Sequence, residues 1–187
     1  MITQAQYREG LEFTLDMLSK ANIAISSNEI KEIEVTDFGL GNYPLEGAQI
    51  VTLLNTHKVG FKIICLMEGQ YLPEHMHTAS LGEEGKEETL RAIYGTARVF
   101  IPAEVILQIP RLPVGKELFY TSRHEVALNP PEQLTILPDT PHWILGGCGG
   151  CVVYSVSSWA RCALDPFTDP TVVRETVVKN TPGTNRG

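Results

Sequence analysis

The chain has 187 residues, 43% of them hydrophobic and 20% charged, a composition that is typical of folded globular proteins and excludes disorder, collagen and coiled coil. The 15 Lys and Arg against 22 Asp and Glu give a net charge of −7, which argues against a nucleic-acid partner because phosphates are repelled. No apolar run approaches the ~20 residues of a membrane span. The first residues lack the pattern of a signal peptide, so the four cysteines are expected to be reduced thiols in the cytoplasm.

The N-terminal part of the chain predicts two helices. Apolar residues recur with a period near 3.6 over residues 3–21, and Thr3 is suited to be the N-cap. A second, shorter helix is expected to start at Ser27 or Asn28 and to extend over residues 29–33. We expect both helices to pack on the outside of a larger unit.

From about residue 35 onward, short apolar runs alternate with Gly, Pro and Asn. Such spacing predicts a mainly β fold, a sandwich or small antiparallel barrel, and the lack of helices between the runs disfavours a doubly wound α/β fold. We expect one domain, with a helical segment at 1–34, a barrel at 35–178 and a flexible tail at 179–187. The expected strands are Ala48–Leu54, Gly60–Met67, Thr89–Ile101, Glu125–Leu128, Gln133–Leu137, His142–Leu145 and Cys151–Ser155.

Two histidines, His75 and His77, directly follow the strand expected at Gly60–Met67 and the turn after it. Residues two apart in an extended chain point to the same face, so both imidazoles can reach one metal ion. Glu88 and His142, each at the start of an expected strand, are the candidates for further ligands. A His-x-His pair alone is a weak motif, because histidines at the end of a strand are ordinary surface residues.

The wider pattern resembles the cupin family, whose first motif is Gly, five residues, His-x-His, a short gap, Glu, six residues and Gly. Gly69 and Gly95 stand at the two glycine positions, but the gap before Glu88 is ten residues rather than three or four. The second cupin motif is matched in part by Pro138 and His142. The resemblance implies a small barrel with one metal ion inside, held by three His and one Glu. The acids competing with Glu88 within or beside the gap are Glu83, Glu84 and Glu87.

Over about residues 28–170, the chain is similar to the D-lyxose isomerase family of cupins. The similar phrases are DFGLG, GQYLPEHMH, EEGKEETLRAIYG, LPDTPHW and DPFTDP. The resemblance implies an enzyme that interconverts D-lyxose with D-xylulose, and often D-mannose with D-fructose. It implies one divalent metal ion, usually Mn²⁺, with Zn²⁺, Co²⁺ and Fe²⁺ as alternatives. Cupins frequently form homodimers through sheet edges, so a homodimer is expected by analogy.

Three further residues enter the expected site through this resemblance. Lys62 lies between apolar neighbours on a presumed inward face, and the family places it in the sugar site. Lys86 occupies the family's Lys-x-Glu position, where it is expected to bind substrate or to act as an acid or base. Asp169 matches a C-terminal acid position and is the other candidate base, with Asp165 as its competitor. Either aspartate has an alternative interpretation as a turn residue, because Asp-Pro commonly opens turns.

The remaining conspicuous residues are interpreted as structural. Glu74 is expected to point away from the ligand side of His75, into solvent or behind the site, and Trp143 is expected to pack in the core. Cys148 and Cys151 form a CxxC motif without a second pair at zinc spacing, since Cys65 and Cys162 do not provide one. His57 and His124 have no partner at ligand spacing.

Three functions compete at this stage. The first is a sugar isomerase that transfers a proton through a metal-bound cis-enediol, with a side chain as general base. The second is a cupin dioxygenase that uses iron at the same ligands. The third is a sugar-binding module without turnover. Two inward lysines favour a hydroxyl-rich substrate over the drier pocket of a dioxygenase.

Overall fold

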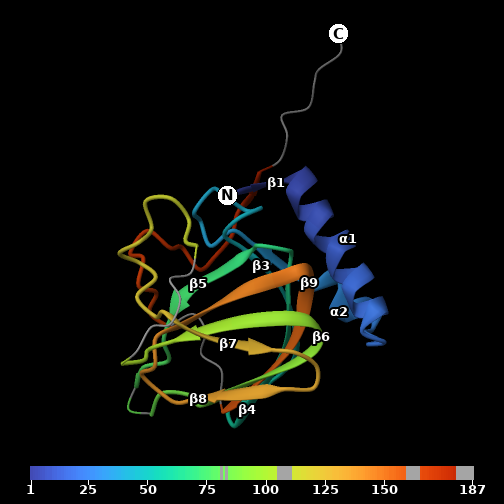
Figure 1. Cartoon of the computed structure of the whole chain (residues 1–187). Helices are drawn as coiled ribbons and strands as arrows, with labels where there is room; N and C mark the ends of the chain where they lie inside the picture. Colours follow the sequence, from blue (N-terminus) through green and yellow to red (C-terminus); the bar gives the residue numbers. More distant parts are fainter. Residues whose placement is uncertain (81, 83, 105–110, 159–164, 180–187) are drawn as a thin grey trace.

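In this computed structural model, residues 1–80, 82, 84–104, 111–158 and 165–179 are described. They form two helices and ten strands, with most strands wrapped into a barrel (Figure 1). The elements in chain order are β1 (Ile2–Thr3), α1 (Gln4–Lys20), α2 (Ser27–Lys31), β2 (Glu34–Thr36), β3 (Ala48–Asn55), β4 (Val59–Leu66), β5 (Tyr71–His75), β6 (Glu88–Ile101), β7 (His124–Leu128), β8 (Gln133–Ile136), β9 (His142–Ser158) and β10 (Val178–Lys179).

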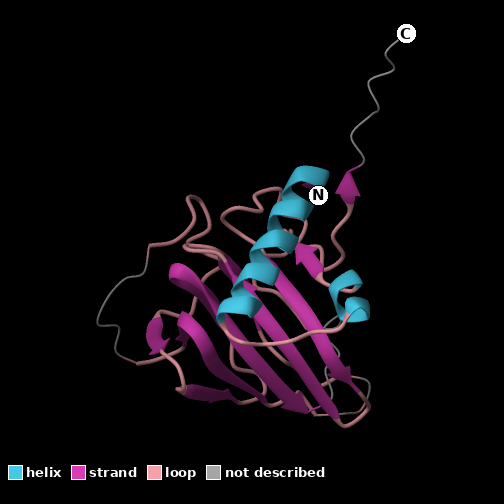
Figure 2. Ribbon diagram, turned by 90° about the vertical axis from the view of Figure 1, so that its right-hand side faces the viewer, coloured by secondary structure: helices cyan, strands magenta, loops and turns pink. Residues whose placement is uncertain are grey.

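The main sheet is antiparallel and has the strand order β2-β3-β4-β9-β6-β7. Two further strands complete the barrel, since β5 pairs with β9 and β8 pairs with β6. The short β1 and β10 form a separate parallel pair. Helix α1 lies across the outer face of the sheet, with α2 beside it (Figure 2). The mainly β prediction, with the N-terminal helices outside, is therefore confirmed.

Local sequence explains where both helices begin. The Thr3 side chain caps α1 by accepting a hydrogen bond from the backbone N–H of Gln6, and the Gln6 side chain accepts one from the backbone N–H of Thr3. Ser26 and Glu29 form the same reciprocal arrangement at the start of α2. Such capping boxes satisfy backbone donors that the first helical turn leaves unpaired. The helix predicted over residues 3–21 and the one predicted from Ser27 are confirmed, although the second cap is Ser26.

Alternate side chains of strand β4 belong to two different apolar clusters, one inside the barrel and one beneath α1. Ile64 and Leu66 point into the barrel, whereas Ile63 and Cys65 point outward and pack beneath α1. Successive side chains in a strand face opposite sides, so one strand contributes to both cores. The same parity directs Lys62 inward with Ile64, as the sequence predicts, and both residues line the same pocket.

The two strands predicted at His142–Leu145 and Cys151–Ser155 are one continuous strand, β9, so the turn expected between them is wrong. The register with β6 shows the reason. Gly95 pairs with Cys151 and Ala97 with Gly146, so four residues of β9 stand opposite the single Thr96 of β6. This is an extended bulge, and glycine allows the positive φ it needs. Four short strands, β1, β2, β5 and β10, were not predicted from the sequence.

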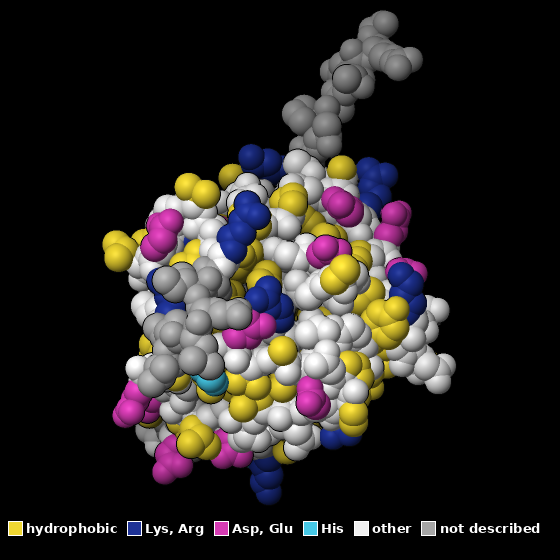
Figure 3. All heavy atoms as spheres, in the orientation of Figure 1, with side chains coloured by type: hydrophobic (Ala, Val, Ile, Leu, Met, Phe, Trp, Pro, Cys, Tyr) yellow, Lys and Arg dark blue, Asp and Glu magenta, His cyan; other side chains and the backbone are white. Residues whose placement is uncertain are grey.

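The described residues end at Lys179, within β10, so residues 180–187 of the expected tail lie outside them. Neither helix in the described part of the chain is long and apolar enough to cross a membrane. Figure 3 shows basic and acidic side chains interspersed on one face, gathered beside apolar ones around a hollow. On the described part of that face there is no continuous basic stripe of the kind that binds nucleic acid.

The glycines at the bulge provide a test of this register. Gly95 has φ of +65° and a Cβ built there would lie 2.1 Å from the Gly150 carbonyl oxygen, whereas Gly149 has φ of +74° but nothing within 4 Å. We expect Gly149→Ala to cost about 1–2 kcal/mol from its φ alone. Gly95→Ala should cost a further ~1–3 kcal/mol because atoms overlap. Urea unfolding of both variants measures the difference, and equal losses would contradict the close approach of β6 to β9 at Gly95.

Candidate metal and sugar site

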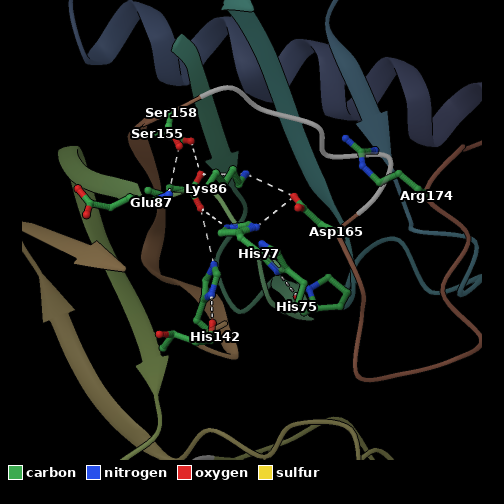
Figure 4. Close-up of polar contacts among 12 residues, drawn as sticks. His75, His77, Lys86, Glu87, His142, Ser155, Ser158, Asp165 and Arg174 are labelled. Atoms are coloured by element: carbon green, nitrogen blue, oxygen red, sulfur yellow. Dashed lines mark hydrogen bonds and ion pairs between the residues drawn. The ribbon is translucent and has the colours of Figure 1, made fainter. Parts of the chain in front are cut away.

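Three histidines and one glutamate meet inside the barrel. One ligand atom from each of His75, His77, Glu88 and His142 lies within 4.8 Å of the others. The residues come from three strands and one loop, because His75 ends β5, His77 follows it, Glu88 begins β6 and His142 begins β9 (Figure 4). The ring centroids of His75 and His142 are 4.3 Å apart, and the two residues are directly paired across β5 and β9.

A register shift in β5 turns His75 inward. Leu72 faces the barrel core, and regular alternation would direct the odd-numbered His75 to the opposite side. The pairing with β9 is interrupted between Leu72 and His75, and this irregularity restores the inward direction at His75. A local irregularity of the β5 backbone therefore sets the inward direction of the His75 side chain.

Backbone carbonyls fix the orientation of two of the imidazoles. Nδ1 of His75 donates to the carbonyl of Pro73 at 2.9 Å, and Nδ1 of His142 donates to the carbonyl of Thr140 at 2.8 Å. Donation from Nδ1 leaves the Nε2 lone pair available for a metal. Nε2 of His142 is buried and has no hydrogen-bond partner in the described structure. A buried lone pair without a partner, among three other ligand atoms, fits a bound cation.

Glu88 is buried at the centre of the cluster. Its carboxylate accepts a hydrogen bond from the Ser155 hydroxyl and lies 2.9 Å from Nε2 of His77 and 3.8 Å from Nζ of Lys86. Burial opposes ionisation of Glu88, but Lys86, His142 and His77 outweigh it and hold the pKa of Glu88 well below its usual value. The carboxylate is thus charged and ready to ligate.

Asp165 joins the cluster from the C-terminal side. Its Oδ2 lies 3.1 Å from Nδ1 of His77 and 3.4 Å from Nζ of Lys86 (Figure 4). Burial raises the pKa of Asp165, but His77 and Lys86 have the larger combined effect and lower it. A carboxylate, an ammonium group and a ligand imidazole are therefore in contact inside the pocket.

The two neighbouring histidines differ in charge preference. Burial, His142 and His77 lower the pKa of His75 well below its usual value, which keeps His75 neutral. Burial also opposes protonation of His77, but hydrogen bonds to Asp165 and Glu88 outweigh it and raise the pKa of His77. A metal ion arriving at His77 must therefore compete with a proton that the two carboxylates favour.

The cluster opens into a pocket whose empty space, with the open solvent at its mouth included, is about 460 Å³. Its lining combines apolar and aromatic side chains with charged and polar ones. The lining residues are Phe38, Ile50, Lys62, Ile64, Leu72, His75, Lys86, Glu88, Ser155, Asp165, Phe167 and Arg174.

The structure brings together most of the residues that the sequence nominates. Lys62 and Lys86 both line the pocket, and Lys86 is only 8% exposed. Asp169 is not among the lining residues, because its carboxylate pairs with Lys116 and accepts hydrogen bonds from Thr171. Of the acids that competed with Glu88, Glu84 and Glu87 are exposed, and Glu83 lies outside the described residues.

Several expectations for the remaining residues can be compared directly. Trp143 is fully buried and stacks on Phe100, so its core role is confirmed. Glu74 is not in the ligand cluster and is buried, so of the two expected placements the structure shows the one behind the site. Cys148 and Cys151 are both free thiols, and Cys162 lies outside the described residues.

Four pocket residues were not predicted from the sequence: Ser155, Phe38, Phe167 and Arg174. Ser155 left a signal, because it follows Val153 on the inward face of β9 as a polar residue in an apolar row. Arg174 left no such signal in the sequence. It lines the pocket while paired with Glu34, a residue 140 positions away in the sequence.

Comparison with curated proteins identifies close relatives. The chain is 39% identical over 175 residues to the D-lyxose ketol-isomerase of Cohnella laeviribosi, covering 93% of this chain and 96% of that protein. It is 40% identical over 176 residues to the D-lyxose/D-mannose isomerase of Thermosediminibacter oceani, covering 93% and 97%. The chain belongs to the D-lyxose ketol-isomerase family. The family membership expected from the sequence phrases is confirmed, although no family model matches the chain.

Solved structures support the fold of this family member. The L-ribose isomerase of Cellulomonas parahominis superposes with a TM-score of 0.78 at 16% identity, covering 95% of this chain and 98% of that one. The L-ribose isomerase of Geodermatophilus obscurus gives 0.77 at 14% identity, with the same coverage. At such identities the likeness concerns the fold alone. The cupin barrel expected from the sequence is confirmed.

Metal binding can be tested with a matched pair of histidine variants. His142→Ala removes the buried imidazole with the unpartnered Nε2, whereas His124→Ala removes a half-buried imidazole at the start of β7 that is not in the cluster. We expect His142→Ala to lower the affinity for a divalent ion at least about 100-fold, because loss of an outer partner alone costs about 10–100-fold. Elemental analysis after dialysis measures metal per chain. Equal retention in both variants would contradict the proposed ligand.

The role of Asp169 has a distinct pH signature. Burial raises the pKa of Asp169, but Lys116 and Thr171 outweigh it, so the pKa lies below its usual value of 3.8. A lowered pKa stabilises the fold above pH 3.8, and the stabilisation is lost as pH falls through the lowered value. We expect Asp169→Asn to lower the free energy of unfolding by about 2 kcal/mol at pH 7.

The comparison for Asp169→Asn is denaturant unfolding of wild type and variant from pH 7 downward. The difference should be constant near neutrality and should shrink below pH 3.8. A variant with unchanged stability and a large loss of turnover would instead support a direct catalytic role.

Proposed function

We propose that this chain is a metal-dependent aldose–ketose isomerase that interconverts D-lyxose and D-xylulose, and also D-mannose and D-fructose. The observation that supports it most is the contact of Lys86 and Asp165 with the four-residue ligand cluster in one pocket. The names of the relatives, D-lyxose ketol-isomerase and D-lyxose/D-mannose isomerase, supply the substrate class.

His75, His77, Glu88 and His142 are the proposed ligands of one divalent ion. A ligand set of three imidazoles and one carboxylate suits Mn²⁺, and Zn²⁺, Co²⁺ and Fe²⁺ are accommodated by the same donors. When bound, the ion polarises the sugar carbonyl and stabilises negative charge on the adjacent oxygens. The hydrogen bonds from Nδ1 of His75 to Pro73 and from Nδ1 of His142 to Thr140 orient both imidazoles for it.

Asp165 and Lys86 are the proposed acid–base pair. The Asp165 carboxylate lines the pocket and is ionised, so it can accept the C2 proton of an aldose and return it at C1 by way of a cis-enediol. Lys86 Nζ, 3.4 Å from Asp165, keeps that carboxylate charged and can donate to a sugar oxygen. We prefer Asp165 to Asp169 as the base because Asp169 is engaged by Lys116 outside the pocket lining.

The remaining lining suits a polyol. Lys62 and Arg174 carry charged donors that are proposed to bind sugar hydroxyls, and Phe38 and Phe167 offer apolar surface to the C–H groups. A dioxygenase pocket would be expected to contain fewer cationic groups. A module that only binds sugar would not need an acid–base pair beside the ligands.

Two further features belong to the proposal. A homodimer is proposed by analogy with other cupins, and light scattering of the purified protein tests it. A cytoplasmic location is supported by the free thiols of Cys65, Cys148 and Cys151, because free cysteines persist in reducing compartments.

The decisive assay follows the interconversion of D-lyxose and D-xylulose, and of D-mannose and D-fructose, by the metal-loaded protein. We expect Asp165→Asn to reduce kcat by about 10²–10⁴-fold while metal stays bound, because a general base contributes that much. Glu87→Gln is the matched control, since Glu87 is an exposed carboxylate that points away from the cluster (Figure 4). No turnover of any of the four sugars would refute the function.

Deuterated water tests the proton-transfer route. A cis-enediol route with an exchangeable base places deuterium at C1 of ketose made from aldose, and at C2 of aldose made from ketose. Products that stay free of deuterium over many turnovers would indicate a hydride shift or a base fully shielded from water.

A further inference from the structure

Glu74 is a buried carboxylate that neither the metal cluster nor the pocket lining uses. It directly precedes His75 and lies within the irregular part of β5, so it faces away from the ligands. Its side chain is almost completely enclosed, with 1% of the residue exposed. A buried carboxylate is costly unless its oxygens are hydrogen-bonded, so its contacts indicate what it does.

Three neutral donors satisfy Glu74. Oε1 accepts hydrogen bonds from the hydroxyls of Thr121 and Thr168, both at 2.8 Å, and Oε2 accepts one from the backbone N–H of Ser122 at 2.7 Å. No cation pairs with Glu74 among the residues that the structure describes. Both carboxylate oxygens of Glu74 therefore have donors, and the three bonds join this side chain to two separate segments of the chain.

One of these contacts lies on the segment that carries Asp165. The backbone of residues 166–168 runs antiparallel to the end of β5, with His75 opposite Phe167. The Thr168 N–H donates to the Glu74 carbonyl at 3.0 Å, and the Met76 N–H donates to the Pro166 carbonyl at 3.1 Å. The hydroxyl of Thr168 adds the side-chain bond to Glu74, so backbone and side chain fix the same register.

The other contacts lie behind His142. Ser122 accepts a hydrogen bond at its carbonyl from Nε1 of Trp143 at 2.8 Å, and its hydroxyl donates to the Pro141 carbonyl at 2.7 Å. Ser122 therefore fastens the segment before β7 to the start of β9. Glu74 lies between this segment and the one that carries Asp165.

We propose that Glu74 is a positioning residue that holds residues 166–168 in register beside His75 and thereby places the Asp165 carboxylate against His77 and Lys86. The inference rests on the proposed function, in which Asp165 is the base. Asp165 stands one residue before the paired segment, so a shift of that segment moves its carboxylate directly. Displacement of a reacting group by about 1 Å can cost about 10²-fold in rate.

Thr121 and Thr168 form a matched pair for the test, because both hydroxyls donate to the same oxygen at the same distance. Thr168→Val removes the bond on the Asp165 side, and Thr121→Val removes the bond on the other side. We expect Thr168→Val to lower kcat about tenfold with KM and bound metal unchanged, and Thr121→Val to keep kcat within about twofold. Equal effects of the two variants on kcat would overturn the proposal.

Glu74 itself is tested by conservative rescue. Glu74→Gln keeps the shape, and its amide can donate to the two threonine hydroxyls while its oxygen accepts from Ser122, so we expect most of kcat to remain. Glu74→Ala leaves three donors without a partner and is expected to lower kcat about 10–100-fold. If Glu74→Gln loses as much kcat as Glu74→Ala, the positioning role is wrong.

A double-mutant cycle separates this inference from the proposed function. In an Asp165→Asn background, Glu74→Ala should reduce kcat by less than about twofold, because there is no base left to misplace. Additive losses would overturn the positioning role while leaving Asp165 as the base. Full activity in Asp165→Asn alone would instead refute the base assignment.

Hydrogen exchange gives a readout that is independent of turnover. We expect Thr168→Val and Glu74→Ala to speed amide exchange in residues 165–169, and Thr121→Val to leave it unchanged. This measurement remains informative if no sugar is isomerised or if Glu74→Ala is too unstable to assay, because Thr168→Val changes a single bond. Unchanged exchange in Thr168→Val would overturn the proposal.

Discussion

The cluster of three histidines and Glu88 depends on the pairing of β9 with three other strands. This 17-residue strand lies between β4 and β6 and also pairs with β5 at its first residues. The pairing places His142 opposite His75 at one end and brings Ser155 to Glu88 farther along. Backbone hydrogen bonding between these strands therefore sets the positions of His75, His142 and Glu88. Their side chains meet because each of these strand positions faces the inside of the barrel.

The site gathers charge in a place where charge is costly. Glu88, Lys86 and His77 are each less than 10% exposed, and Asp165 contacts two of them. Desolvation penalises every isolated ion there, so each group stays charged only while its neighbours do. A divalent cation bound here would compete with the proton that Asp165 and Glu88 favour on His77. Removal of one of these charged groups would therefore disfavour the charged forms of the groups that remain.

The sequence was informative where the chemistry is local. His75 and His77 are two apart, and strand alternation was enough to predict that their imidazoles can reach one point, while the Lys-x-Glu position pointed to Lys86 beside Glu88. The spacing from Glu88 to Gly95 selected, among several glutamates, the one that the structure places in the cluster, and Gly95 itself stands at the bulge of β6 with a positive φ that other residues resist.

Long-range contacts were beyond that reasoning. The inward direction of His75 depends on an irregularity in β5 that depends on how β9 pairs with it, and no local pattern marks it. Asp165 was only one of two acids four residues apart, and its place beside His77 depends on the bridge between His75 and Phe167. Glu74 was expected behind the ligands or in solvent, but the donors that bury it lie 47, 48 and 94 residues away in sequence.

Strand β4 separates two environments by the thickness of a single backbone. Lys62 faces the pocket, while the adjacent Ile63 packs beneath α1 on the opposite side of the sheet. A change of volume under the helix therefore acts on the backbone that carries a pocket lysine, without altering any residue in the pocket. Directed evolution of substrate range can therefore also target the contact between α1 and the sheet, because substitutions there can shift the strand that forms part of the pocket wall.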